Sequence, residues 1–538
     1  MRNSYLLAAT GSLALAMTAA SARPKADHPS ANAQRELIEE VRALRAEVAA
    51  LKTRLDGQPD MKSELDATKA QLAALETASD ASQKALETKL DAVPAQIEAS
   101  NEAARHASSF GMKGLSITPG GFLTLTGIYR QHFMGNDISS GFNAIPFPNG
   151  RAGQLSETRI TPRASRLSLL VEGVVSAKTK LSFYGEFDFQ GAAQNANSNQ
   201  SNSFNPRIRN LYGTIDWVGK AGGLHLLAGQ NWSLVTMNSK GITPRNEVAP
   251  PEIDGQFMPG FAWTRQPQIR LTADLLDHSL WLALSVENPQ TTFGGAVPAN
   301  VTNLAPGGVG FDANNMLSLN ELPDIVGKVA YEGKLGGRSF HVETFGLVRQ
   351  FSARYAAGRT GHATGYGFGG GIMMQLFPGL LDAQFSGITG HGIGRYGSAQ
   401  LPDVTFAADG TIAPIPETML LAGLTLHATK RLDIYAYAGE ERASRRDYGA
   451  AAGVLYGYGN ALANNSGCLI EGGVCAGSSR RVRQLAAGLW QDLYRGSFGR
   501  AQIGFQYSIT DRTLFAAVGG EPTARQNMGF ISFRYFPF

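Results

Sequence analysis

Apolar and polar residues alternate through most of the chain beyond Gly111. The clearest segment covers residues 180–190, where Leu181, Phe183 and Phe187 are separated by charged or polar residues. Successive side chains of a strand point to opposite faces, so this pattern predicts strands with one apolar and one polar face. About sixteen such segments begin near Gly121, Pro162, Lys178, Pro206, Gly223, Phe261, His278, Asp324, Arg338, Ala363, Leu380, Glu417, Arg431, Arg483, Ser497 and Arg525.

The connections between these segments alternate in length. Short connections at 176–177, 219–222, 273–277 and 430 follow or precede long ones at 191–205, 235–260, 288–323 and 443–481. A soluble sandwich has no reason to sort its loops in this way, whereas a transmembrane barrel has short turns on one side and long loops on the other. We therefore expect an all-β transmembrane barrel of about 16 antiparallel strands over residues 113–538, with both termini on one side.

The last strand supports this interpretation. Ile531, Phe533 and Tyr535 share one face, Ser532 and Arg534 share the other, and the chain ends on an aromatic residue, Phe538. This end resembles the closing strand of bacterial outer-membrane β-barrels, and the resemblance implies that the barrel-assembly machinery reads the terminal aromatic side chain. Pro537 departs from that pattern because it lacks an N–H group and interrupts the alternation, so we expect the final residues to be bulged or frayed.

The N-terminal residues have a different character. Residues 1–22 combine a basic Arg2, an apolar run and small residues up to Ala22, which predicts a cleaved signal peptide, with an anchor helix as the alternative. Residues 23–112 are predicted to contain a periplasmic coiled coil, because apolar residues recur at alternating spacings of four and three. The flanking charges favour parallel self-association, and Val at a with Leu at d leans towards dimers. The alternative is a single solvated helix that acts as a spacer. The apolar positions are Leu37, Val41, Leu44, Val48, Leu51 and Leu55.

Composition excludes several function classes. No stretch beyond the N-terminus has 18 uninterrupted apolar residues, which argues against transmembrane helices. The formal net charge of +4 is small and the basic residues are dispersed, so nucleic acid is not an expected partner. The chain has no nucleophile elbow, phosphate-binding loop or Cys/His metal spacing. We expect no enzyme activity, no cofactor and no metal, although a barrel enzyme with a dispersed Ser/His pair stays possible.

Several sequence runs resemble the DcaP-like family of porins. They are residues 226–233 (LLAGQNWS), 263–270 (WTRQPQIR) and 435–441 (YAYAGEE), combined with the signal, the coiled coil and the sixteen segments. The resemblance implies trimers of sixteen-stranded barrels in the bacterial outer membrane, with the coiled coil in the periplasm. It also implies passive diffusion of small anionic solutes such as dicarboxylates. The alternative function is a structural or binding protein that uses the coiled coil to tether the envelope.

An anion channel needs fixed cations along its water-filled interior. By strand alternation we place Arg166 and Glu172, Gln266, Gln268 and Arg270, Lys328 and Arg349 on inward faces, with the cations among them as candidate anion-binding residues. Arg265 is a further candidate, although its parity is outward unless Pro267 introduces a bulge. Arg207 and Arg209 share parity with Leu211 and are expected above the lipid band. Each of these arginines has an alternative role at the rim or as a partner of Glu186, Asp188 or Glu343.

Two loops carry further candidates. The loop at 235–260 is stiffened by prolines and either folds into the lumen as a constriction or stays on the surface. Its charged residues are Lys240, Arg245, Glu247, Glu252 and Asp254. Cys468 and Cys475 are the only cysteines, and two exported cysteines this close predict a disulfide within one outer loop. From Gly114 onward there are about 34 Lys and Arg against about 29 Asp and Glu. This surplus predicts anion selectivity, which would invert if Glu172, Glu186 and Asp188 surrounded the narrowest point.

Overall fold

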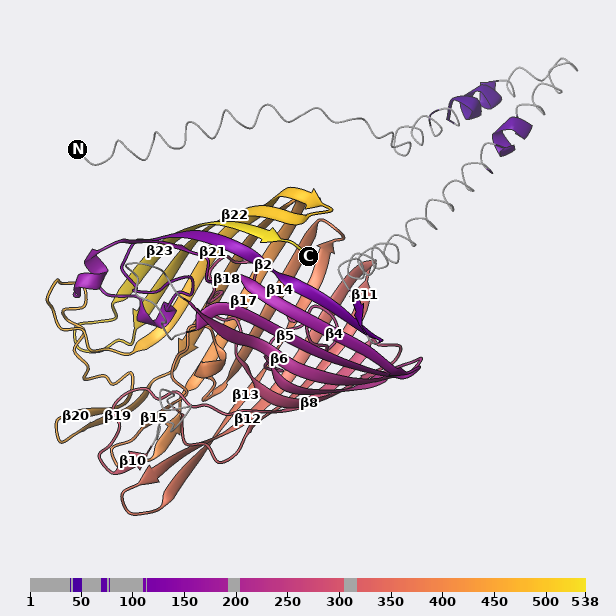
Figure 1. Ribbon diagram of the computed structural model, residues 1–538. Helices are drawn as coiled ribbons and strands as arrows, with labels where there is room; N and C mark the ends of the chain where they lie inside the picture. The colour runs from indigo at the N-terminus through magenta and orange to yellow at the C-terminus, as the bar shows by residue number, and fades with distance from the viewer. Residues whose placement is uncertain are drawn as a thin grey trace, which may run out of the picture. The chain divides into compact units, whose positions relative to one another are not determined.

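The protein is described from a computed structural model (Figure 1). The structure describes Glu39, residues 42–50, 69–74, Thr77, residues 110–112, 114–191, 204–303 and 317–538. The chain divides into two compact units, Met1–Ala104 and Arg105–Phe538. The predicted signal peptide lies outside the described residues, as does most of the predicted coiled coil. Residues 42–50 and 69–74 of that region are helical, and Leu44 and Val48 are partly buried.

Residues beyond 114 form a closed antiparallel β-barrel, and the predicted number of about sixteen strands is confirmed. In the described part of the chain, β3 and β4 together occupy one position, so 17 elements make 16 barrel strands. These elements are β2 (Leu115–Arg130), β3 (Glu157–Thr161), β4 (Arg166–Ser176), β5 (Thr179–Gly191), β6 (Asn205–Val218), β7 (Gly223–Trp232), β8 (Arg265–Leu275), β9 (Leu280–Glu287), β11 (Asp324–Leu335), β12 (Arg338–Tyr355), β13 (Thr360–Phe377), β14 (Leu381–His391), β17 (Pro416–Thr429), β18 (Leu432–Ala443), β21 (Ser479–Gly496), β22 (Gly499–Leu514) and β23 (Thr523–Phe536).

The two ends of the barrel sequence pair with each other. Leu123 to Arg130 of β2 lie opposite Tyr535 to Met528 of β23, which closes the sheet. On its other edge β2 pairs first with β4 and then with β3, and the residues between β3 and β4 interrupt that strand. β23 ends at Phe536, so Pro537 and Phe538 lie beyond the last ladder hydrogen bond.

The connections sort by length, as the sequence predicts. Short turns join β4 to β5, β6 to β7, β8 to β9, β11 to β12, β13 to β14, β17 to β18 and β21 to β22. Among the described residues, four of the longer connections at the other end carry small elements of their own. Within the described residues, the short links at that end join β12 to β13, which are 18 residues long each, and β22 to β23. The small elements are η1 (Phe142–Ala144), η2 (Arg151–Gln154), η4 (Gly394–Tyr396), β10 (Val301–Asn303), the hairpin of β15 (Val404–Phe406) and β16 (Ile412–Pro414), and the hairpin of β19 (Arg446–Ala451) and β20 (Val454–Tyr458); β1 (Phe110–Met112) pairs with β2 at the opposite end.

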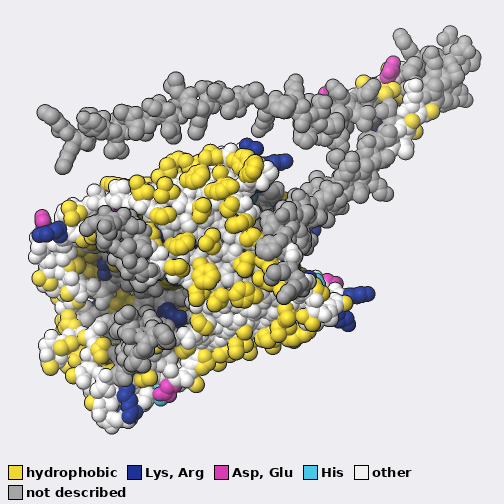
Figure 2. Space-filling model, viewed as in Figure 1, with side chains coloured by type: hydrophobic (Ala, Val, Ile, Leu, Met, Phe, Trp, Pro, Cys, Tyr) yellow, Lys and Arg dark blue, Asp and Glu magenta, His cyan; other side chains and the backbone are white. Residues whose placement is uncertain are grey.

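The outer face of the barrel is apolar. Leu123, Leu125, Ile269, Leu284 and Phe533 are between 46% and 61% exposed, and Figure 2 shows a broad hydrophobic surface between two ends that carry the basic side chains. A lipid bilayer rather than water suits such a surface, since each exposed apolar side chain would otherwise order water around it. No helix in the described part of the chain is long and apolar enough to cross a membrane.

The inner face is polar where strands line it and apolar where loops pack on it. One cluster joins wall residues Trp490 and Tyr435 to Ile253, Phe257 and Phe261 of the connection between β7 and β8. A second cluster joins Trp281 and Phe345 of the wall to Leu234 and Tyr396. The barrel core therefore consists of loops folded onto the inward side chains, and these loops define the lumen.

Candidate functional site: the lumen

The connection 233–264 enters the barrel and crosses it. The backbone amide of Asn238 in this loop donates to Glu343 of β12 at 3.1 Å. The Trp490 Nε1–H of β21 donates to the carbonyl of Pro251, which also belongs to the loop, at 2.8 Å. Gly260 N–H also donates to Glu441 of β18 at 2.9 Å. These contacts tie the loop to three strands of the wall, so of the two arrangements that the sequence left open, the loop folds inward.

A second connection, 392–415, folds onto the first. The Ser398 amide donates to the Phe261 carbonyl at 3.2 Å, and the Gln256 side chain donates to the Ser398 carbonyl at 2.6 Å. The Tyr396 hydroxyl reaches Asp324 of β11 at 2.8 Å. This second inward loop was not predicted, because residues 392–415 contain neither a proline-rich stretch nor a dense charge cluster that distinguishes them from a surface loop.

Three of the predicted anion-binding residues anchor these loops instead of facing open water. Lys328 pairs with Glu343 at 2.8 Å and donates to the Thr236 carbonyl at 2.8 Å. Arg270 donates to the Trp232 carbonyl at 2.6 Å, where the first loop leaves β7. The third residue, Arg349, pairs with Asp324 at 3.0 Å and with Asp403 at 2.6 Å, and it donates to the Gly392 carbonyl at 2.7 Å. All three residues have the inward parity that alternation predicts, and each is 2% exposed.

The expectation that Arg207 and Arg209 lie above the lipid band is wrong. The register between β5 and β6 shifts between Glu186 and Phe187, which face Asn210 and Ile208, so Arg209 is an extra residue on β6. Such a β-bulge reverses the alternation that follows it. Ile208 is therefore exposed on the outer face, and Arg209 is buried inside. The sequence signal for the inward position of Arg207 and Arg209 was the acidic pair Glu186 and Asp188 on the neighbouring strand.

Five inward arginines follow one another along the wall, namely Arg166 of β4, Arg207 and Arg209 of β6, Arg265 of β8 and Arg534 of β23, which we call the arginine cluster. Arg166 and Arg534 both lie over the Phe122 ring, at 5.4 Å and 5.0 Å from its centroid. Arg265 and Arg209 lie over Trp232 at 4.6 Å and 6.0 Å. The shared ring faces offset part of the repulsion between neighbouring guanidinium groups.

Arg265 is in the lumen without the bulge that the sequence required. β7 and β8 pair with no register shift at Pro267. Arg265 is instead the first residue of β8, directly opposite Trp232, the last residue of β7, at the point where the loop 233–264 leaves the wall. Side chains at this point turn towards the loop, so strand parity does not determine their direction.

The carboxylates near the arginine cluster do not neutralise it. Arg209 pairs with Glu186 at 2.5 Å and with Asp188 at 3.1 Å, and Arg207 pairs with Asp188 at 2.6 Å. Within the described residues Arg166 Nε, Arg265 Nη1 and Arg534 Nε are buried without a hydrogen-bond partner. Five positive charges against two negative charges leave a formal +3 in this part of the lumen.

The charged residues of the first loop differ in their surroundings. Lys240 is exposed, and Arg245 lies over the Tyr184 ring at 5.6 Å. Glu247 accepts from Asn231 at 3.0 Å, and its pKa is raised by burial. The Glu252 carboxyl group is buried without a hydrogen-bond partner among the described residues. Burial, followed by the neighbouring Asp254, raises the pKa of Glu252 well above its usual value, and burial likewise raises the pKa of Asp254.

The outer loops contain one covalent link. Cys468 and Cys475 form a disulfide with Cα atoms 4.5 Å apart. Buried Cys468 packs with Ile145, Phe147 and Leu514, and so connects two long loops at the same end of the barrel. In the described part of the chain there is no group of three or more His, Cys, Asp or Glu residues that could hold a metal ion.

The chain is similar to the outer membrane channel DcaP of Acinetobacter baumannii, with 18% identity, a TM-score of 0.58, and coverage of 80% of this chain and 99% of that chain. OmpT of Vibrio cholerae has 9% identity and a TM-score of 0.40, over 80% of this chain and 99% of its own. An anion-selective porin from Comamonas acidovorans has 12% identity and a TM-score of 0.40, over 78% and 99%. No family model and no curated protein sequence matches. The similarity to DcaP shows a shared barrel fold.

Proposed function

We propose that this protein is an outer-membrane porin through which small hydrophilic anions diffuse. The observation that supports the proposal best is the arginine cluster, whose formal +3 faces a lumen narrowed by two loops. The structural neighbour described as an outer membrane channel is consistent with a conducting role. The apolar outer belt supports insertion in a bilayer.

The size of the effect follows from Coulomb's law. A unit charge about 6 Å from a net +3 in a watery lumen gains about 1 kcal/mol when the Debye length is about 10 Å, at 0.1 M salt. This corresponds to a roughly fivefold preference for an anion. At 1 M salt the Debye length falls to about 3 Å and the gain to about 0.3 kcal/mol. Selectivity is therefore expected to be anionic and to decline as salt rises.

The solute class that we propose is the small dicarboxylate. A guanidinium group matches a carboxylate with two parallel hydrogen bonds, and the cluster presents several such groups in sequence along one wall. Arg166, Arg265 and Arg534 are partly exposed and have no carboxylate partner among the described residues, so their charge is available to a passing carboxylate. Succinate added to a chloride-conducting channel should therefore reduce the chloride current more than acetate at equal charge concentration.

The reversal potential of purified protein in a KCl gradient tests the proposal. In the triple variant Arg166→Gln, Arg265→Gln and Arg534→Gln, only the two arginines already paired with Glu186 and Asp188 remain. The reversal potential should then move to near zero, because the local formal charge falls to zero. A wild-type channel that prefers cations would overturn the anion proposal without affecting the fold.

A matched control removes the same charge elsewhere. Lys334, Arg338 and Lys430 are exposed at short turns, outside the arginine cluster. Their replacement by glutamine should leave the reversal potential close to that of the wild-type protein. If both triple variants shift the potential equally, net charge rather than the arginine cluster determines selectivity.

The oligomer and the periplasmic segment belong to the same proposal. We propose that the barrel assembles as a homo-oligomer, most simply a trimer, with residues 23–112 as a parallel coiled coil in the periplasm. The heptad spacing supports self-association of that segment, and the outer membrane is the location that suits an exported β-barrel.

A further inference from the structure

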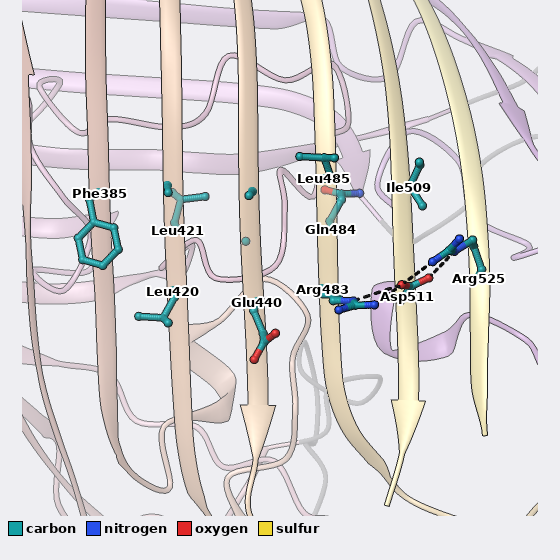
Figure 3. Close-up of a pocket in the computed structure, with 13 residues that line it drawn as sticks. Phe385, Leu420, Leu421, Glu440, Arg483, Gln484, Leu485, Ile509, Asp511 and Arg525 are labelled. Atoms are coloured by element: carbon teal, nitrogen blue, oxygen red, sulfur yellow. Dashed lines mark hydrogen bonds and ion pairs between the residues drawn. The ribbon is translucent and has the colours of Figure 1, made fainter. Parts of the chain in front are cut away.

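A row of four charged residues crosses the outer face of the barrel. Glu440 of β18 lies opposite Arg483 of β21, Arg483 opposite Asp511 of β22, and Asp511 opposite Arg525 of β23. By strand alternation all four side chains point away from the lumen, and Figure 3 shows Arg483 and Arg525 on either side of Asp511. This row is separate from the arginine cluster inside the barrel.

The outer row lies at the boundary of the apolar belt. Moving towards the short turns, the next outward residues include Leu485 and Ile509, whereas moving towards the long loops they include Arg481, Thr513 and Thr523. A charge on the lipid face costs about 2–4 kcal/mol at the bilayer midplane and little near the interface. The row is therefore at the level where lipid headgroups meet the barrel.

A groove of about 580 Å³ adjoins the charged row. Phe385, Leu420, Leu485 and Ile509 line it (Figure 3), together with the small side chains of Ala422 and Ala438. Its shape and apolar lining suit an acyl chain that lies along the barrel wall. The apolar groove and the charged row are therefore adjacent. This arrangement matches a lipid, whose acyl chains would lie in the groove while its headgroup contacts the row.

The arginines of the row are held in place but not saturated. Arg483 donates to Asp511 through Nε and Nη2 at 3.2 Å and 3.0 Å, and Arg525 donates through the same two nitrogens at 2.8 Å and 3.0 Å. Asp511 is 6% exposed, whereas the two arginine side chains are 50% and 60% exposed. Within the described residues the Nη1 groups of both arginines have no partner, so each retains N–H donors for another anion.

The balance of charge determines the sign of the headgroup. Arg481 is 4.0 Å from Glu440, which brings the local set to three arginines and two carboxylates, and Arg442 is exposed on the same edge. The surplus is positive. Both guanidinium groups donate to Asp511 through Nε and Nη2 and keep Nη1 for a further anion, and two such groups beside one carboxylate suit a doubly charged phosphate monoester better than a singly charged or zwitterionic group.

We propose that this groove and row bind a phosphorylated lipid of the membrane leaflet on the long-loop side, with its phosphate on Arg483 and Arg525 and an acyl chain along Leu420 and Leu485. The proposal rests on insertion of the barrel in a bilayer, as in the proposed function, but not on anion conduction. Asp511 positions the two guanidinium groups and does not contact the phosphate.

Native mass spectrometry of detergent-purified protein with bisphosphorylated lipid A tests this site. The wild-type protein should retain the lipid, and the same lipid after removal of its phosphates should bind at least about tenfold more weakly, since charge-assisted hydrogen bonds are lost. In the triple variant Arg483→Gln, Asp511→Asn and Arg525→Gln no charge is left unpaired at the site. We expect its affinity for the phosphorylated lipid to fall by about tenfold or more.

The control variant Arg354→Gln and Arg359→Gln removes two arginines at the same end of the barrel, on a hairpin far from β21–β23 in the sheet order. It should retain the lipid. Equal binding of the phosphorylated and dephosphorylated lipids, or undiminished binding by the triple variant, would overturn the proposal. So would a triple variant that loses its oligomeric state while lipid retention is unchanged, because the face would then be a contact between copies. The reversal potential of the Arg483→Gln, Asp511→Asn and Arg525→Gln variant should equal that of the wild-type protein. The lipid test and the test of anion conduction can then fail independently of each other.

Discussion

Arg349 holds the second inward loop against the wall, and its loss should open the channel. Its guanidinium group joins Asp324 of β11 to Asp403 of the loop 392–415 and also donates to the Gly392 carbonyl. The change Arg349→Met keeps most of the side-chain volume but leaves Asp403 without its cation, whereas Asp324 keeps Arg395 at 3.7 Å. Both carboxylates are 0% exposed in the closed arrangement.

The magnitude can be estimated from the burial of this group. Removing one partner of a buried ion pair costs about 3–5 kcal/mol, because the remaining charge is left uncompensated. The barrel strands keep their ladder hydrogen bonds, so the cost falls on the closed position of the loop, from which Asp403 can reach water by moving away. A change of 3–5 kcal/mol shifts the balance towards the open loop by roughly 150- to 4,000-fold.

Single-channel recording in planar bilayers would measure the result. We expect Arg349→Met to conduct more than the wild-type channel, or to switch between the wild-type and a larger conductance. The compensated variant Arg349→Met with Asp403→Asn neutralises the carboxylate that loses its cation, keeps the pair of Arg395 with Asp324, and should return towards the wild-type conductance. A stable, folded Arg349→Met channel with wild-type conductance and no switching would refute the assignment of Arg349 as the residue that holds this loop.

Three further predictions concern the lumen, the outer loops and the N-terminal segment. The pKa of Glu252 is raised, so its carboxyl group is neutral below that pKa and becomes negative as pH rises through it. Anion selectivity should therefore fall with rising pH. In reversal-potential measurements, Glu252→Gln should weaken that dependence. Reduction of the Cys468–Cys475 disulfide should loosen the outer loop without melting the barrel, since a loop of about eight residues constrains the unfolded chain little; circular dichroism and proteolysis would show the contrast, and global unfolding would contradict it. Deletion of residues 33–97 should leave an inserted barrel whose oligomer dissociates at lower temperature in detergent, and unchanged heat resistance would make this segment a spacer.

The sequence predicts the barrel well because its signal is repeated in every strand. Alternation and loop length follow from the requirement that each strand separate lipid from water, and strands beginning at Asp324 and Arg338 were located to the residue. The surroundings of an inward side chain within the lumen are harder to predict. Alternation put Lys328, Arg349 and Arg270 on the inner face, but whether an inward cation meets water or a folded loop depends on contacts between segments far apart in the chain.

Departures from regular strand geometry caused the remaining differences between the predicted and the observed positions of side chains. The bulge at Arg209 has no signature in the single sequence beyond the acidic residues of β5, so strand parity placed Arg207 on the wrong side. Arg265 lies at a strand end, where the direction of a side chain depends on the loop that follows. Arg534 was assigned to the polar face, but its proximity to Arg166 requires the closure of β23 on β2.

The pairing of β2 with β23 also constrains how the protein can be made. Thr124 and Ser532 are hydrogen-bonded although 408 residues separate them, and closing a flexible loop of that length costs about 5 kcal/mol in entropy before any contact repays it. The first barrel strand has no partner on this edge until β23 is present, so closure requires the whole barrel segment. Until then both edges present unpaired N–H and C=O groups that could join other chains. A chain truncated even shortly before Thr523 would lack its closing strand altogether, so premature termination should produce an aggregation-prone open sheet rather than a smaller channel.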